Sequence, residues 1–257
     1  DSGLVLLHSE NNIALNNTIH SNLNDGLYLD QQSKNNIIES NSITRNVGTG
    51  IGEYGNGSNH IRNNVIAYNG WDGIDMSNNN VVFNNTIVGN RVRGIFCWRY
   101  NTISNNIITS NNEHGIFFGS HNIIEGNTIA NNSPSGFFVR GTSNMIRHNN
   151  FVSNEKQVIL EQPGLWNAWD DGYPSGGNFW SDYNGTDLKS GPNQDQLGSD
   201  GIGDTPYTIS GAYQDRYPLM NPIGSPQKPI AMFTYSPQQP KKDETITLNA
   251  STSYDRD

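Results

Sequence analysis

Hydrophobic positions along the first 160 residues recur with a long fixed period and show no helical spacing. An Ile, or a Phe in the last copy, stands two residues after an Asn, at Ile19, Ile43, Ile66, Ile87, Ile108, Ile129 and Phe151. Seven residues later most copies have a glycine followed by Leu, Ile or Phe, at Gly26, Gly50, Gly73, Gly94, Gly115 and Gly136. A fixed period of this length indicates structural repeats that stack on one another.

Each copy divides into short runs of alternating apolar residues separated by turn residues, which is typical of strands. Copies stacked ~4.8 Å apart form parallel sheets in which equivalent positions make columns. The chain is therefore predicted to be all-β, a right-handed parallel β-helix over residues 1–160. The predicted inward column is Leu27, Ile51, Ile74, Ile95, Ile116, Phe137 and Ile159. The predicted outward column is Tyr28, Gly52, Asp75, Phe96, Phe117, Phe138 and Leu160.

Asn is the commonest residue and follows the same period. One column is Asn17, Asn41, Asn64, Asn85, Asn106, Asn127 and Asn149, and a second is Asn22, Asn46, Asn69, Asn90, Asn111, Asn132 and Asn154. Asn tolerates the left-handed turn conformation, and stacked amides can bond to the copies above and below. We therefore expect ladders of Asn side chains along the β-helix.

Residues 161–222 break the period and are rich in Trp, Gly and Asp. Such a segment suits a cap over the open end of a solenoid. A Pro-rich linker then leads into residues 223–257, which hold two strand-like stretches. Two strands alone are only marginally stable, so they are expected to belong to a longer parent chain or to pair with another molecule.

Composition and charge limit the partners and the location that the protein can have. The net charge is −9 with only 15 Lys and Arg residues, which argues against nucleic acid or an anionic membrane as the partner. The sequence contains no run of 18 apolar residues, so no membrane span is predicted. Cys97, the single cysteine, excludes an internal disulfide and falls in an inward column. The chain opens with Asp1 inside a repeat, so we expect a processed or excised piece of an exported protein.

Polar residues beside the predicted strands form a candidate catalytic group: Asp72, Asp75, Arg93 and His114. Paired carboxylates beside a base or an Arg could perform acid–base chemistry on a glycan. An Asp before a Gly is equally ordinary in turns. Glu53 falls in an inward column, and the Gly-rich segment 48–57 is expected to bulge and release it to solvent.

An aromatic strip follows the outward columns: Tyr54, Phe96, Trp98 and Phe117. Phe rings in succession on a solvent face are unusual. They could form a platform on which sugars stack, or residues 161–225 could cover them.

Metal and modification sites are also suggested. Asp187, Asp195, Asp200 and Asp204 lie on Gly-rich turns, where oxygen ligands suit Ca²⁺. The alternative is acidic turns closed by their own hydrogen bonds, or a pair between Asp215 and Arg216.

Copper prefers clustered His, Met or Cys. The six His residues occupy scattered repeat positions, so copper is not expected. Glycosylation sequons occur at Asn16, Asn56, Asn84, Asn131, Asn184 and Asn249.

Three motifs after the repeats carry a family resemblance: residues 177–183 (GNFWSDY), 200–207 (DGIGDTPY) and 215–220 (DRYPLM). With the repeats, residues 1–222 resemble the NosD-type β-helix proteins, described as periplasmic copper-binding and grouped with carbohydrate-binding and sugar-hydrolysing β-helices. The resemblance implies an exported, often archaeal and surface-attached protein. Residues 229–237 and 244–257 resemble the first strands of a PKD domain, an Ig-like module of cell-surface proteins.

Three functional hypotheses follow. The favoured one is a non-catalytic, glycan-associated cell-surface protein with a structural or adhesive role, located outside the cell. The second is a secreted polysaccharide lyase, epimerase or hydrolase, and the third is a carbohydrate-binding module. The expected partners are an envelope polysaccharide and further copies of the chain, which would contact it through the solenoid ends or the PKD-like strands.

Overall fold

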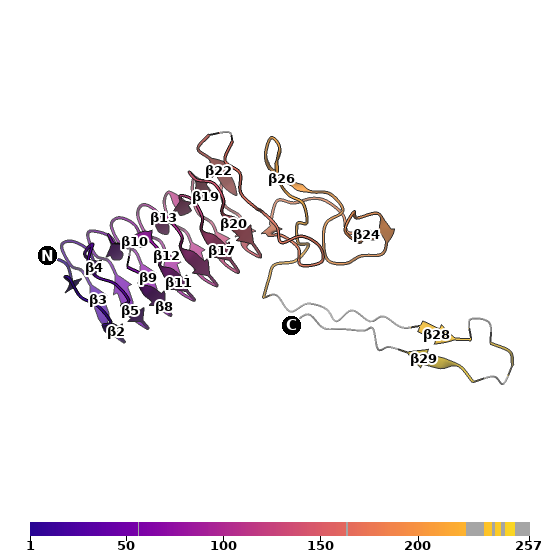
Figure 1. The fold of residues 1–257 in the computed structure, drawn as a ribbon, viewed down its shortest axis with the longest axis horizontal. Helices are drawn as coiled ribbons and strands as arrows, with labels where there is room; N and C mark the ends of the chain where they lie inside the picture. Colours follow the sequence, from indigo (N-terminus) through magenta and orange to yellow (C-terminus); the bar gives the residue numbers. More distant parts are fainter. Residues whose placement is uncertain (56, 163, 225–233, 238–239, 243–244, 250–257) are drawn as a thin grey trace. The chain divides into compact units, whose positions relative to one another are not determined.

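The computed structural model describes residues 1–55, 57–162, 164–224, 234–237, 240–242 and 245–249. The chain divides into two compact units, Asp1–Met220 and Asn221–Asp257. The prediction of an all-β right-handed parallel β-helix is confirmed (Figure 1). The described residues contain no helix long and apolar enough to cross a membrane.

Each turn of the β-helix, here called a coil, adds one strand to each of three parallel sheets. The first sheet holds β1 (Leu4–Leu6), β4 (Leu27–Leu29), β7 (Ile51–Glu53), β10 (Ile74–Asn78), β13 (Ile95–Arg99), β16 (His114–Phe118), β19 (Ser135–Val139) and β22 (Val158–Leu160). The second holds β2 (Ile13–Leu15), β5 (Ile37–Glu39), β8 (His60–Arg62), β11 (Val81–Phe83), β14 (Thr102–Ser104), β17 (Ile123–Glu125) and β20 (Met145–Arg147). The third holds β3 (Thr18–His20), β6 (Ser42–Thr44), β9 (Val65–Ala67), β12 (Thr86–Val88), β15 (Ile107–Thr109), β18 (Thr128–Ala130), β21 (Asn150–Val152) and β23 (Phe179–Trp180).

The core is a narrow column of apolar side chains inside the three sheets. Ile66, Ile87 and Ile108 are register partners in successive coils, as the repeat predicted. All three are fully buried, and burial of such a side chain contributes roughly 1.5–3 kcal/mol. Cys97 lies in this column between Met76 and Phe118, as expected. Because each coil repeats the same inward positions, the core extends without widening.

Asn ladders line the corners of the β-helix, and there are three where two were predicted. The third is Asn12, Asn36, Asn59, Asn80, Asn101, Asn122, Asn144 and Asn167. At most rungs the backbone N–H and the side-chain amide of one Asn donate to Oδ1 of the Asn in the next coil. The side-chain amides of Asn59 and Asn80 donate to Glu53 instead. Asn85, for example, donates to Asn106 Oδ1 at 2.8 and 3.0 Å. The buried corner amides therefore satisfy one another.

The residue before each ladder Asn from Asn12 to Asn154 turns the chain through the left-handed region. Asn84 and Asn105 have φ of 54° and 56° and precede Asn85 and Asn106. Asn adopts this conformation more readily than most residues, which explains the recurring Asn-Asn pairs. Tyr68, with φ of 57°, precedes Asn69 of another ladder and shows that a larger residue is accommodated at the equivalent position of that corner.

The predicted columns are wrong by one residue in the last coil. Phe137 pairs with Val158, and Phe138 pairs with Ile159, so Ile159 belongs to the outward column. Gln157 takes the place of the missing glycine, since its carbonyl accepts the N–H of Phe137. The turn between Asn154 and Gln157 is one residue shorter than in the preceding coils, and this shortening shifts the register.

Residues 161–220 continue the ladders and then close this end of the β-helix. Asn178 accepts from Asn149 at 3.0 Å, and β23 pairs with β21. The Trp180 ring stacks on Phe151 at 4.2 Å between centroids, and Tyr207 stacks on the other face of Trp180 at 4.2 Å. The segment also contains two hairpins. They are β24 (Lys189–Ser190) with β25 (Gln196–Leu197), and β26 (Tyr207–Ser210) with β27 (Tyr213–Asp215).

Asp215 is the polar centre of this cap. The carboxylate is fully buried and accepts from Asn178 N at 2.7 Å, Trp180 Nε1 at 2.8 Å and Tyr217 N at 3.1 Å. Burial raises the pKa of Asp215 to about 7, against the opposing effect of these donors. The alternative pair between Asp215 and Arg216 is not formed, because Arg216 instead binds Asp170 at 2.6 Å.

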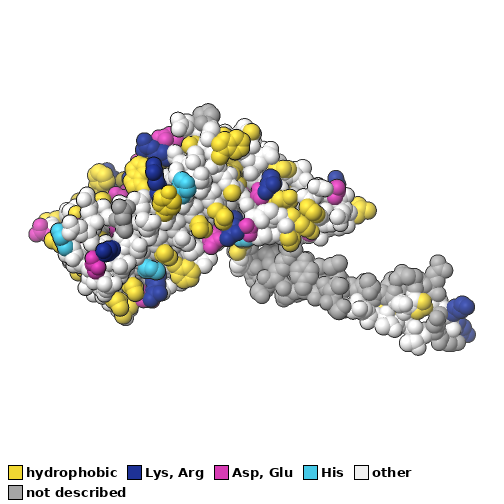
Figure 2. Space-filling view, in the orientation of Figure 1, with side chains coloured by type: hydrophobic (Ala, Val, Ile, Leu, Met, Phe, Trp, Pro, Cys, Tyr) yellow, Lys and Arg dark blue, Asp and Glu magenta, His cyan; other side chains and the backbone are white. Residues whose placement is uncertain are grey.

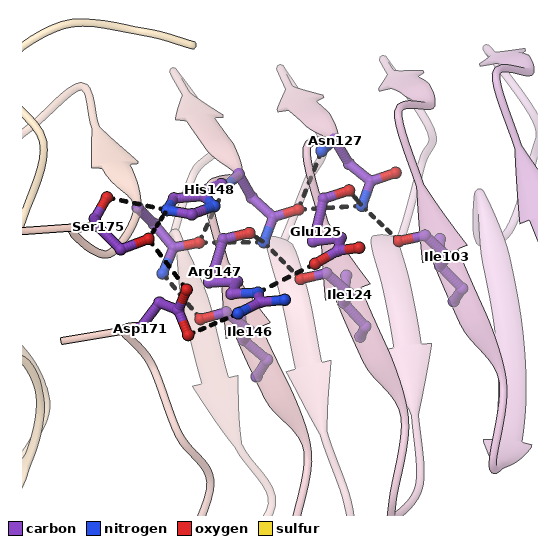
Figure 3. A network of polar contacts seen from close by, with 11 residues as sticks. Ile103, Ile124, Glu125, Asn127, Ile146, Arg147, His148, Asp171 and Ser175 are labelled. Atoms are coloured by element: carbon purple, nitrogen blue, oxygen red, sulfur yellow. Dashed lines mark hydrogen bonds and ion pairs between the residues drawn. The ribbon is translucent and has the colours of Figure 1, made fainter.

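A polar cluster joins the cap to the second sheet (Figure 3). Arg147 on β20 lies between two carboxylates, Glu125 on β17 and Asp171 in the cap, and forms ion pairs with both. His148 Nε2 is within hydrogen-bond distance of the backbone oxygen of Ser175, at 3.0 Å. The cap is therefore attached by side-chain contacts as well as by the continued sheet.

The second unit is described only in part. Its β28 (Thr234–Ser236) and β29 (Thr247–Asn249) pair antiparallel. Residues 225–233 and 250–257, which carry much of the resemblance to a PKD domain, lie outside the described residues, and that resemblance stays a prediction.

Candidate functional site

A cavity of about 780 Å³ opens on the outer face of the first sheet, over β4, β7 and β10. Three aromatic rings and three carboxylates line it: Tyr28, Tyr54, Trp71, Asp25, Asp30 and Asp75. His8, which also lines it, is paired with Asp30 Oδ2 at 2.8 Å. On the face of the first unit drawn in Figure 2, hydrophobic side chains lie in small patches among charged ones.

Gly52 interrupts the outward column at the cavity. It is the register partner of Tyr28 in one neighbouring coil and of Asp75 in the other. A Cβ at Gly52 would lie 2.8 Å from the Tyr54 ring, so the missing side chain lets that ring fold over the strand. Tyr54 then meets Tyr28 with 5.4 Å between ring centroids. The cavity thus forms where the repeat lacks a side chain.

Two carboxylates in the cavity have raised pKa values. Burial raises the pKa of Asp75 to about 6, and the charge of Asp72 adds to this shift. Asp25 is 7% exposed, and burial raises its pKa while the hydrogen bond from Thr49 N opposes the change. Burial and the nearby carboxylates also raise the pKa of Tyr54, so its hydroxyl stays protonated.

The structure gives the four predicted catalytic residues different surroundings and pairs two of them with each other. Asp75 lines the cavity, whereas buried Asp72 is held by Arg93 through Nε at 2.9 Å and Nη2 at 2.8 Å. His114 Nδ1 is 2.9 Å from Ser135 Oγ, and its ring lies 4.8 Å from the Phe138 ring. Burial and the charge of Arg93 lower the pKa of His114 to about 4, so the imidazole is neutral near pH 7.

The aromatic strip continues from the cavity along the first sheet. Phe96, Phe117 and Phe138 are half-buried, with centroids 5.1 and 4.8 Å apart in sequence. Arg93 lies 4.3 Å above the Phe96 ring, and Trp98 meets the same ring edge-on at 5.1 Å. The Phe rings therefore pack against one another and against Arg93 and His114, whereas Trp98 remains exposed.

The expectation that Glu53 reaches solvent is wrong. Its side chain is fully buried and accepts from Asn80 Nδ2 at 2.9 Å, Ser77 N at 3.0 Å and Gly55 N at 3.0 Å. Donors from the irregular loop and the next coil thus satisfy a carboxylate that the repeat pattern places inside. Burial raises the pKa of Glu53, and its charge contributes to the raised pKa of Asp75 on the other face of the sheet.

The Gly-rich acidic turns of the cap are closed by backbone donors. Asp187 accepts from Asp200 N and Gly201 N at 3.0 and 2.9 Å. Asp204 accepts from Lys189 N at 2.9 Å, and Asp195 is exposed beside β25. Among the residues that the structure describes, no three His, Cys, Asp or Glu side chains lie close enough to share a metal ion. Calcium at these four Asp residues remains a prediction.

The predicted glycosylation residues in the described chain are all exposed. Asn16, Asn84 and Asn131 occupy left-handed corners, and Asn184 and Asn249 lie in the cap and the second unit. Asn56 lies outside the described residues. Sequence reasoning did not assign Tyr28, Trp71 or Asp25 to a site, although Asp25 shares a repeat position with Asp72, directly before the glycine.

Comparisons with known proteins agree on the fold. The family model of the periplasmic copper-binding protein NosD matches residues 72–185, and that of the right-handed β-helix region matches residues 1–102. No curated protein matches the chain.

Similar solved structures include a mutant of the periplasmic alginate epimerase AlgG, with 18% identity and a TM-score of 0.60. The match covers 65% of this chain and 46% of that one. The A-module of the Azotobacter vinelandii mannuronan C-5 epimerase AlgE6 has 20% identity and a TM-score of 0.52, with 65% and 57% covered. The chain thus spans about half the length of these structures. Together the matches identify a right-handed parallel β-helix.

Proposed function

We propose that this β-helix is an exported glycan-binding protein that holds a polysaccharide in the cavity over β4, β7 and β10. The observation that carries the proposal is the meeting of aromatic rings and carboxylates in one cavity. Apolar faces of sugars pack on aromatic rings, and a few placed polar groups fix a ligand's orientation. A surface role in adhesion or in the cell envelope, as predicted from the sequence, is compatible with such binding.

Individual side chains suit this ligand. Trp71 is 60% exposed and lines the cavity, so its ring is available for stacking. The Tyr54 hydroxyl remains a donor because of its raised pKa, and Asp25 and Asp75 offer acceptors to sugar hydroxyls. The cavity therefore combines stacking with both hydrogen-bond roles.

The strip beyond the cavity can extend the contact. Trp98 occupies the same repeat position as Tyr54, two coils further along the first sheet. At ~4.8 Å per coil this is ~10 Å, so a polymer lying along the axis could contact both rings. Solved structures with the same fold include alginate and mannuronan epimerases, which supports a polysaccharide as the ligand and a periplasmic or extracellular location.

Titration calorimetry with a panel of polysaccharides tests the proposal. We expect Trp71→Ala to weaken the binding of the best ligand by about tenfold or more, since stacked aromatic rings dominate such contacts. Trp166→Ala is the matched control, because Trp166 is 69% exposed but belongs to the cap. Equal effects of the two substitutions, or no binding to any glycan, would contradict the proposal.

A catalytic role is the second candidate, and the raised pKa of Asp75 favours it. With a pKa of about 6, Asp75 could carry a proton in mildly acidic conditions and deliver it within the cavity. Incubation of the bound polysaccharide with the protein, followed by analysis of chain length and sugar configuration, tests this role. Product that forms with the native protein and disappears in Asp75→Asn, with binding retained, would support it.

A further inference from the structure

The cavity has an excess of negative charge. Asp25, Asp30 and Asp75 all line it, and His8 is the only basic side chain among the lining residues that the structure describes. His8 is paired with Asp30, so its positive charge, when present, is already offset. The carboxylates of Asp25 and Asp75 therefore have no basic partner in the cavity lining.

Arg93, whose charge acts on Asp75, is already engaged. Its guanidinium binds both oxygens of Asp72 and lies over the Phe96 ring. An anionic sugar is commonly held by a guanidinium that donates two parallel hydrogen bonds. Since Arg93 uses that arrangement on Asp72, a uronate in the cavity would face Asp25 and Asp75 without such a partner and would be repelled by them.

The surroundings of Asp25 indicate which chemical group of a ligand the cavity would bind. It is more than nine-tenths buried, and its Oδ1 accepts from Thr49 N at 2.8 Å. The hydrogen bond from Thr49 goes to Oδ1, and within the described chain Oδ2 is not a buried atom that lacks a partner, so Oδ2 is open to the cavity that Asp25 lines. An oxygen open to the cavity can accept from a ligand in place of solvent, and a charged donor forms the stronger hydrogen bond.

Building on the proposed glycan binding, we propose that the cavity takes an amino sugar whose protonated amine lies against Asp25 and Asp75. An ammonium supplies three donors and one positive charge. The faces of Tyr28, Tyr54 and Trp71 also attract a cation. A metal ion fits less well, because no three acidic or His side chains in the described residues converge on one point.

Calorimetry with three oligosaccharides of equal length tests the charge preference: a glucosamine oligomer, its N-acetylated form and a mannuronate oligomer. We expect the glucosamine oligomer to bind at least about tenfold more tightly than the N-acetylated one, and the mannuronate oligomer most weakly. Added salt should reduce the advantage of the amine, because screening weakens exposed charge pairs.

Asp25→Asn and Asp75→Asn should weaken binding of the glucosamine oligomer more than binding of the N-acetylated one, so that the preference for the amine is lost. Asp25→Asn keeps an oxygen to accept from Thr49 N, so the fold is expected to survive, which circular dichroism checks. Glu155→Gln, an exposed change of equal charge in a distant coil, is the control. A preference that persists in both Asp variants, or tightest binding of mannuronate, would overturn the inference.

The outcome also separates this inference from the proposed function. If both glucosamine forms bind equally and Trp71→Ala weakens both, the cavity binds glycans without selecting an amine, and the inference is wrong. If no oligosaccharide or polysaccharide binds, the proposed function is wrong as well.

Discussion

The coils and the cap of this protein are stabilised in opposite ways. In the coils, most buried Asn residues of a ladder have equivalents in neighbouring coils that make the same bonds, as Asn64, Asn85 and Asn106 do. In the cap, donors from three separate residues converge on Asp215 alone. Repetition distributes the stabilisation over many equal contacts, whereas the cap depends on one group that no other residue duplicates.

The proposed glycan-binding cavity lies where the repeat pattern of the coils is interrupted. Gly52 and Asp75 occupy the outward column that further along holds Phe96 and Phe117. Because Gly52 and Asp75 stand where later coils have a Phe ring, a cavity opens on the outer face of the first sheet. Four substitutions, from the largest expected effect on stability to the smallest, test this contrast.

Asp215→Ala should be the most damaging. It leaves the N–H groups of Asn178, Trp180 and Tyr217 without an acceptor, and each buried unsatisfied donor costs about 1–3 kcal/mol. We expect the free energy of unfolding to fall by about 3–5 kcal/mol in urea denaturation. Asp195→Ala, at an exposed position of the same cap, should change it by less than about 0.5 kcal/mol. Similar losses for both would show that the cap does not depend on Asp215.

Asn85→Ala should cost less, about 2–4 kcal/mol, because neighbouring rungs keep their bonds. It removes the acceptor for Asn64 and the donor to Ile61 O. Asn17→Ala is the matched control in the same ladder, since Asn17 is exposed, and should cost about 1 kcal/mol or less. If the two substitutions cost the same, burial of the ladder amides does not contribute.

Asp75→Asn should change how stability depends on pH. The pKa of Asp75 is about 6 in the fold against 3.8 for a free side chain, so the folded state binds the proton more tightly. Its contribution is complete below pH ~4 and is lost as pH rises to ~6, with an expected size of about 1–2 kcal/mol after solvent screening. Urea denaturation across this range should show the loss in the native protein and a smaller one in Asp75→Asn. Identical pH profiles would contradict the assigned shift.

Gly52→Ala should affect binding more than stability. The added Cβ meets the ring of Tyr54, a side chain that can rotate away, so the free energy of unfolding should change by less than about 1 kcal/mol. The displaced ring would no longer line the cavity, and we expect glycan affinity to fall by several fold in calorimetry. Tyr54→Phe, which keeps the ring in place, is the comparison. Unchanged affinity in Gly52→Ala would exclude the Tyr54 ring from the site.

Much of the β-helix could be predicted because the sequence pattern that specifies each coil is short and recurs along the chain. Ile66, Ile87 and Ile108 are partners for the same reason that Asn64, Asn85 and Asn106 are: equal spacing places them at equal positions in successive coils. The third Asn ladder had the same signal and was overlooked. The register of the last coil was predicted wrongly because its marker glycine is replaced by Gln157.

The candidate site was only partly predictable. The sequence indicated Asp75 and Tyr54, but the cavity also needs Asp25 and Trp71, which come from the turns before two different strands. No repeat position marks a cavity, since it depends on how the Tyr54 ring folds over Gly52.

By itself, then, the sequence determined that the chain winds into stacked coils, which side chains face inward, and where Asn turns the corners. Periodic spacing suffices for these, because every coil repeats the same local geometry. Tertiary structure alone decided that Glu53 stays buried, that Arg93 is held by Asp72, and that Asp215 binds Trp180 from 35 residues away. Those outcomes depend on single side-chain contacts between irregular segments, for which the chain has no second copy to reveal a pattern.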